Sequence, residues 1–93
     1  MEKILTLHSD PNKSGKNIDK VQYDLISSAI VKSLENNKKL SHVELQNAVI
    51  QLVKEQFSGS IPWYCETVKL DLEARNIIQR VKTDNKTVYK LYL

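Results

Sequence analysis

Apolar residues recur at three- and four-residue spacings along much of the chain, which is the period of α-helices packed on one side. The first such stretch begins after Asp19, a residue suited to cap a helix, and ends near residues 36–37. The second begins at Ser41, which forms a Ser-x-x-Glu capping box with Glu44, and extends to about Gln56. These patterns predict two consecutive amphipathic helices.

A third helical stretch follows a short turn that contains glycine. Ser60 is placed to cap this helix, and Pro62 is tolerated in its first turn because the amides there have no helical partner. The pattern continues to about Arg75, and Asn76 follows at a position where a left-handed residue often ends a helix. The sequence therefore predicts a third helix that ends before residue 76.

Strand-like alternation of apolar and polar residues is found near both ends of the chain. Residues 3–7 predict a short strand that pairs with another strand, and the turn formers of residues 9–17 predict the longest loop. Residues 77–81 and 87–93 alternate around a turn at 83–86. The chain is thus expected to end in a β-hairpin.

The order of these elements predicts the fold class. Three helices, with a tight turn between the last two, followed by a hairpin form the order of a winged helix-turn-helix. We therefore predict a mainly α fold with a small hairpin (α+β) in one domain over residues 1–93. Residues 1–17 would form an N-terminal strand and loop, residues 18–76 the three helices, and residues 77–93 the wing.

Two stretches carry a resemblance to known families. Residues 72–81, Leu-Glu-Ala-Arg-Asn-Ile-Ile-Gln-Arg-Val, resemble the winged-helix signature, with Asn76 in place of the commoner glycine after the recognition helix. Residues 63–75, with the upstream segments 7–13 and 18–20, resemble a bacterial family of small proteins catalogued only as a domain of unknown function. That resemblance spans nearly the whole chain. It implies a winged-helix fold and a bacterial source, and it brings no established activity or functional residue.

Composition and charge narrow the classes of function. The chain is 41% hydrophobic and 27% charged, and charges interrupt its apolar stretches, so a membrane protein is not expected. Residues 1–7 lack the features of a signal peptide, which predicts a cytoplasmic protein. The net charge is +3, and residues 77–93 alone carry +3. A basic C-terminal end is compatible with nucleic acid as a partner.

The sequence offers no catalytic motif. His8 and His42 are isolated from other metal ligands, so no metal site is expected. No nucleophile stands beside a base, and the lone Cys65 on an apolar helix stripe is expected to be a small buried hydrophobe. We therefore expect neither an enzyme nor a cofactor.

The third helix carries two apolar stripes on roughly opposite sides. The stripe expected to face the core contains Ile61, Cys65, Val68 and Leu72. The second contains Trp63, Thr67, Leu70 and Ala74. A helix that reads the major groove usually presents hydrogen-bonding side chains instead, and the nearby acids Glu66, Asp71 and Glu73 would oppose phosphate contact. Base reading by this helix is therefore not expected.

Two hypotheses of function follow, with different residues. In the first, a winged-helix regulator or accessory protein, acting as a homodimer, contacts the phosphates of double-stranded DNA through Lys69, Arg75, Arg80, Lys82 and Lys86. The hairpin lysines have the alternative role of protecting an edge strand from aggregation. In the second, Trp63, Thr67 and Leu70 form a patch for a second copy or another protein, unless the N-terminal segment covers them.

Overall fold

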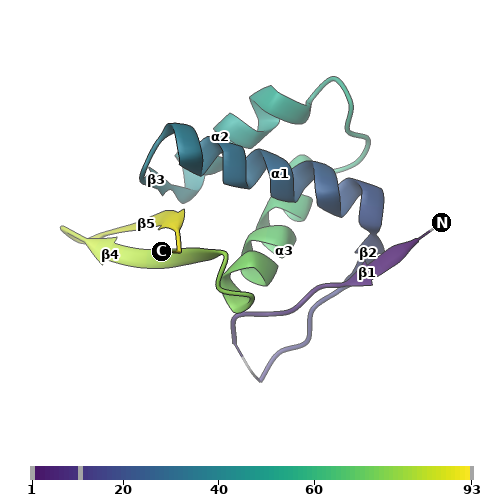
Figure 1. Cartoon of the computed structure of the whole chain (residues 1–93), viewed down its shortest axis with the longest axis horizontal. Helices are drawn as coiled ribbons and strands as arrows, with labels where there is room; N and C mark the ends of the chain where they lie inside the picture. The colour runs from purple at the N-terminus through teal and green to yellow at the C-terminus, as the bar shows by residue number, and fades with distance from the viewer. Residues whose placement is uncertain (1, 11, 93) are drawn as a thin grey trace.

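Three helices and two small antiparallel sheets make up the part of the chain that the computed structural model describes, residues 2–10 and 12–92 (Figure 1). This is an α+β arrangement, as expected. The helices are α1 (Lys20–Asn36), α2 (His42–Val53) and α3 (Ile61–Ala74). No helix in these two ranges is both long and apolar enough to cross a membrane.

Each helix begins at the cap that the sequence predicted. Asp19 accepts a hydrogen bond from the backbone N–H of Val21, at 3.1 Å, and Ser60 accepts one from Trp63 at 3.3 Å. Ser41 and Glu44 form both hydrogen bonds of the capping box. The prediction was wrong at the end of α2, because residues 54–56 form a turn and not a last helical turn.

The larger sheet contains the C-terminal hairpin and one additional short strand. The hairpin strands β4 (Ile78–Thr83) and β5 (Lys86–Leu91) are joined at Asp84 and Asn85, whose φ angles are 46° and 65°. Two consecutive residues with positive φ match the twist of a tight hairpin. The short strand β3 (Leu40–Ser41) pairs with β5, so the strand order is β3-β5-β4. The hairpin was predicted, whereas β3 was not.

The smaller sheet lies at the N-terminal end and pairs β1 (Lys3–Leu5) with β2 (Asn17–Asp19). The predicted strand over residues 3–7 is thus shorter than expected, and its partner lies where the sequence indicated the end of a loop. Beyond β1, Thr6 is buried and continues the pairing. Its N–H donates to the carbonyl of Lys16 at 2.8 Å, and its hydroxyl accepts from the Lys16 N–H at 2.7 Å.

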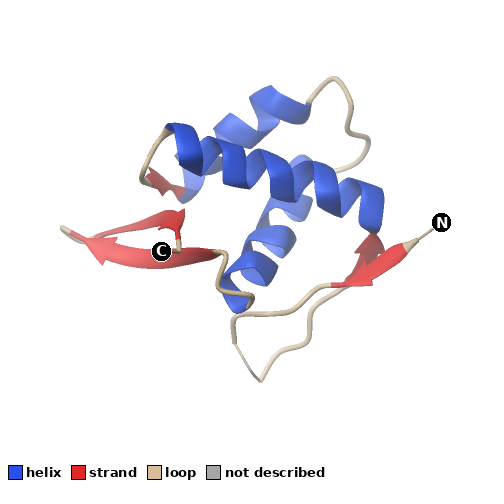
Figure 2. Ribbon diagram, viewed as in Figure 1, coloured by secondary structure: helices blue, strands red, loops and turns tan. Residues whose placement is uncertain are grey.

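The helices lie together, with the C-terminal hairpin on one side of them and the two N-terminal strands on the other (Figure 2). The hydrophobic core consists of buried side chains from all three helices and from β2, β4 and β5. Most apolar positions expected to face the core are buried, and the central ones are Ile26, Ile30, Leu45, Val49, Val68 and Leu72. Val21 and Leu52 are exceptions, with exposed fractions of 66% and 41%. Both lie in a terminal turn of their helices, although Val53, the neighbour of Leu52 in the same turn, is buried.

Candidate functional site

Helix α3 lies between the C-terminal hairpin and the N-terminal strands, so it has one flank toward each of them (Figure 1). The hairpin side contains four of the five cations that the sequence proposed for DNA contact, whereas Arg75 lies on the N-terminal side, where it shares Asp71 with Leu7. The N-terminal side contains part of the proposed apolar patch. The hairpin side therefore tests the hypothesis of DNA binding, and the N-terminal side tests the hypothesis of a protein-binding patch.

The N-terminal segment covers one part of the predicted apolar patch and leaves another part open. A cavity of about 160 Å³ separates residues 6–8 and 14–16 from Thr67 and Leu70, both of which are half-buried. Trp63 stays 44% exposed. The patch is thus partly covered and partly exposed. Thr67 and Leu70 lie beside the N-terminal segment, whereas Trp63 faces solvent.

A fully buried carboxylate joins the N-terminal segment to two helices. Asp71 accepts a hydrogen bond from the backbone N–H of Leu7 at 2.7 Å, a second from the hydroxyl of Tyr23, and a third from Arg75 Nε at 2.9 Å. Burial and the hydrogen bond to Asp71 raise the pKa of Tyr23 well above its ordinary value. The sequence had suggested that Asp71 is a surface acid that repels phosphate. That interpretation was wrong, because the carboxylate is enclosed and paired.

Lys69 lies in a second polar cluster and is buried, with an exposed fraction of 1%. Its Nζ is 2.9 Å from a carboxylate oxygen of Glu66, 2.6 Å from His42 Nδ1, and 4.4 Å from the centre of the Tyr89 ring. Burial alone would raise the pKa of Glu66, but the hydrogen bond and charge of Lys69 outweigh it and lower the pKa. The Lys69 ammonium is therefore occupied within the protein.

The two arginines of the predicted set are also paired with acids. Arg75 donates to Asp71, which raises the pKa of the guanidinium. Arg80 Nη2 is 3.1 Å from a carboxylate oxygen of Glu73, and its Cζ is 5.6 Å from the centre of the Tyr89 ring. Together with Lys69, three of the five proposed DNA contacts are thus neutralised by carboxylates of α3.

Lys82 and Lys86 are placed differently, at the exposed tip of the hairpin. They flank the Asp84–Asn85 turn, and no ion pair of either lysine is present among residues 2–10 and 12–92. Lys86 also borders an open cavity of about 590 Å³ whose other wall is the first turn of α2, with Ser41, His42, Val43 and Glu44. The structure therefore leaves two of the five predicted cations exposed near the hairpin tip, and the register of β4 and β5 places them on opposite faces of the hairpin.

The sequence contains a signal for part of this pairing that the predictions above did not use. Glu66 and Lys69 are three residues apart, and Asp71 and Arg75 are four apart, which are the spacings at which helical side chains meet. The role of His42 had no such signal, because it depends on the packing of α2 against α3. Spacing alone could therefore have identified two of the paired cations.

The remaining reactive side chain is Cys65, which is 1% exposed, as predicted. Burial raises the pKa of its thiol to about 11. The thiol therefore remains protonated at neutral pH, and a protonated buried thiol is a poor nucleophile. In the two described ranges, no group of three or more His, Cys, Asp and Glu side chains is placed to hold a metal ion.

Comparison with known proteins places most of the chain in one family. Residues 3–88 match the sequence model of a family described as "Family of unknown function (DUF6958)". No curated protein matches the chain. The match confirms the expectation that the chain is related to an uncharacterised family, and it covers both sides of α3 and the hairpin tip.

Proposed function

Because this chain belongs to DUF6958, a family of unknown function, we propose its role from its own residues: it is a winged-helix module that contacts the backbone of double-stranded DNA through its hairpin tip. Lys82 and Lys86 supply these contacts. The protein would act as a small regulator or accessory protein in the cytoplasm of a bacterium, in line with the resemblance described above.

The position of β3 supports the winged-helix interpretation. This strand lies between α1 and α2 in sequence and pairs with β5, which places it beside a hairpin that follows α3. A helix-turn-helix formed by α2 and α3, followed by a two-stranded wing to which β3 adds a third strand, then accounts for every element after α1. The strands β1 and β2 are an addition to this pattern.

The observation that carries the DNA proposal is the charge of the hairpin tip. The hairpin contains Arg80, Lys82, Lys86 and Lys90 against the single acid Asp84, and the two tip lysines are exposed. Cations at a protruding tip can neutralise phosphates without reading bases. We remove Lys69 from the proposed contacts because it is buried, and we assign Arg75 and Arg80 a minor role because carboxylates already pair with them.

Reversing the charge of both tip lysines tests this proposal. We expect Lys82→Glu with Lys86→Glu to weaken binding to a random DNA duplex by at least about tenfold at low salt, because a protein that neutralises fewer phosphates releases fewer counterions. Fluorescence anisotropy across a salt series measures both the affinity and its salt dependence. The slope of log K against log salt should become shallower by roughly 0.9 for each phosphate that is no longer neutralised.

A matched variant separates a local effect from a change in net charge. Lys13→Glu with Lys54→Glu changes the charge equally at two exposed positions outside the hairpin. If this variant weakens binding as much as the tip variant, or if the tip variant binds like the unchanged protein, the hairpin tip is not the contact surface.

One observation favours a second function, association with another copy of the chain. Trp63 is exposed and packs edge-to-face on Tyr64, with ring centres 5.0 Å apart, and Tyr64 packs in the same way on Phe57 at 4.9 Å. Exposed tryptophan supported by other aromatic rings is typical of interface hot spots. Such a surface is suited to a homodimer.

We expect Trp63→Ala to raise the dimer dissociation constant by at least about tenfold, since a hot-spot residue contributes about 2 kcal/mol or more. Sedimentation equilibrium of the two proteins measures this change. Leu52→Ala, which removes another exposed apolar side chain, is the control. If the protein without substitutions is monomeric at all accessible concentrations, the proposal of a homodimer is wrong.

A further inference from the structure

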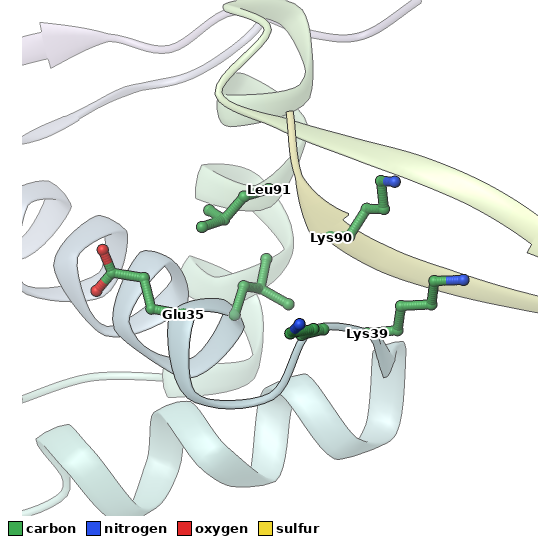
Figure 3. A pocket seen from close by; sticks show the side chains of 6 residues that line it. Glu35, Lys39, Lys90 and Leu91 are labelled. Atoms are coloured by element: carbon green, nitrogen blue, oxygen red, sulfur yellow. The ribbon is translucent and has the colours of Figure 1, made fainter. Parts of the chain in front are cut away.

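A cavity of about 420 Å³ opens at the base of the hairpin, where the end of α1 meets β5 (Figure 3). Its lining consists of Leu34, Glu35, Lys38, Lys39, Lys90 and Leu91. Leu34 is 2% exposed and Leu91 is half-buried, so both are anchored in the core and provide a fixed apolar floor. The volume falls within the range of small-molecule pockets, roughly 300–1,000 Å³.

The charges around this cavity are predominantly positive. Lys39 and Lys90 extend in the same direction beside β5, whereas the carboxylate of Glu35 points away from both of them (Figure 3). No ion pair of the three lysines occurs in the described part of the chain. An anion bound in the cavity would therefore be attracted by lysines that no described carboxylate already neutralises.

The end of α1 explains only part of this arrangement. Lys38 and Lys39 follow the C-cap Asn37, where the negative end of the helix dipole favours cations. Lys90 belongs to β5, and the pairing of β5 with β4 at Gln79 fixes its place. The cations that line the cavity therefore come from two elements, the end of α1 and β5.

We propose that this cavity binds a small aliphatic carboxylate. The carboxylate would lie among the ammonium groups of Lys38, Lys39 and Lys90, and the hydrocarbon body would pack on Leu34 and Leu91. The aliphatic stems of the lysines extend the apolar surface. The lining contains no aromatic ring on which a flat ligand would stack, which favours an alkyl chain over an aromatic acid. This site differs from the hairpin tip that we propose for DNA.

Titration with octanoate, followed in ¹H–¹⁵N NMR spectra of the whole chain, tests the proposal. We expect saturable shifts of the backbone amides of residues 34–39 and 90–91. Lys38→Gln, Lys39→Gln and Lys90→Gln in one protein should weaken binding at least about tenfold, because hydrogen bonds to charged groups contribute substantially. Octanol, which has the same chain and no charge, should bind at least about tenfold more weakly for the same reason.

Two controls give each outcome a defined meaning. Lys13→Gln, Lys32→Gln and Lys54→Gln remove the same charge at positions elsewhere on the chain and should leave octanoate binding unchanged. Circular dichroism verifies that both triple variants are folded, and glutamine retains much of each aliphatic stem. The proposal is overturned if octanoate causes no saturable shift, if the shifts lie outside this cavity, or if both triple variants bind equally.

Competition with DNA distinguishes this site from the proposed nucleic-acid surface. A short DNA duplex added to the octanoate complex should leave the shifts of residues 90–91 in place, because the tip lysines lie at the other end of the hairpin strands. If DNA displaces octanoate and shifts the same amides, the three lysines belong to the DNA surface and the carboxylate site is wrong. A loss of DNA binding in the Lys82 and Lys86 variant has no bearing on octanoate.

Discussion

Replacing Asp71 by alanine is expected to lower the free energy of unfolding by about 3–5 kcal/mol, because the fully buried carboxylate accepts three hydrogen bonds and each bond to a charged group contributes roughly 1.5 kcal/mol or more. The change removes the acceptor for the Leu7 N–H, the Tyr23 hydroxyl and Arg75 Nε at the same time. Groups left without partners in a buried site carry a desolvation cost in addition to the missing hydrogen bonds. Because small domains are stable by only about 5–15 kcal/mol, the variant should lose a large part of its stability.

Urea unfolding monitored by circular dichroism measures this loss, and the chain offers a matched control. Asp24 also pairs with a cation four residues away along a helix, because Lys20 Nζ is 2.9 Å from its carboxylate, but both side chains are exposed. Asp24→Ala should therefore cost less than about 1 kcal/mol. Equal losses in the two variants would show that burial gives Asp71 no special role.

Gly15→Ala should destabilise the protein by about 3 kcal/mol, the upper end of the usual cost of overpacking. A Cβ added to Gly15 would lie 1.8 Å from the carbonyl oxygen of Thr6, which is backbone and cannot rotate away. The segments that carry Thr6 and Lys16 would have to separate, which breaks the hydrogen bonds between them. The next residue, Leu7, would then move away from Asp71.

Hydrogen exchange shows where the Gly15→Ala change acts. We expect the amides of Thr6, Leu7 and Lys16 to lose protection, while those in the middle of α1 and α3 retain it. Ser14→Ala is the control, because Ser14 is exposed and adjacent to Gly15. An unfolding free energy within about 0.5 kcal/mol of the unchanged protein would contradict the expected contact between Gly15 and Thr6.

The helices were predictable because the signals that define them are local. A cap and the amide it satisfies are two or three residues apart, as Asp19 and Ser60 illustrate, and the sequence displays both partners. The strands β2 and β3 were missed for the opposite reason. Each has two or three residues, too few to show alternation, and each is defined only by a distant partner. The pairing of Leu40 with Tyr89 has no counterpart in local sequence.

The candidate site was predictable to a similar degree. The sequence located Lys82 and Lys86 beside a turn, and the turn of a hairpin normally lies at the protein surface. The prediction for Lys69 was wrong. Its position around the helix axis predicted an exposed side chain, whereas it is buried by contacts with His42 and Tyr89 from other elements. Long-range packing therefore decides which cations of α3 remain available, and helical geometry alone does not.

The pairing of the three α3 acids Glu66, Asp71 and Glu73 with cations gives the molecule an uneven distribution of charge. With Lys69, Arg75 and Arg80 each balanced by an acid, the hairpin keeps Lys82, Lys86 and Lys90 against Asp84, a net +2 of the protein's +3, which makes the protein an electric dipole. On an anionic sensor surface or a cation-exchange resin, the chain would adsorb hairpin first and in one orientation. Immobilisation on a carboxylated chip would therefore hide the tip lysines, and binding of nucleic acid is better measured with both partners free in solution.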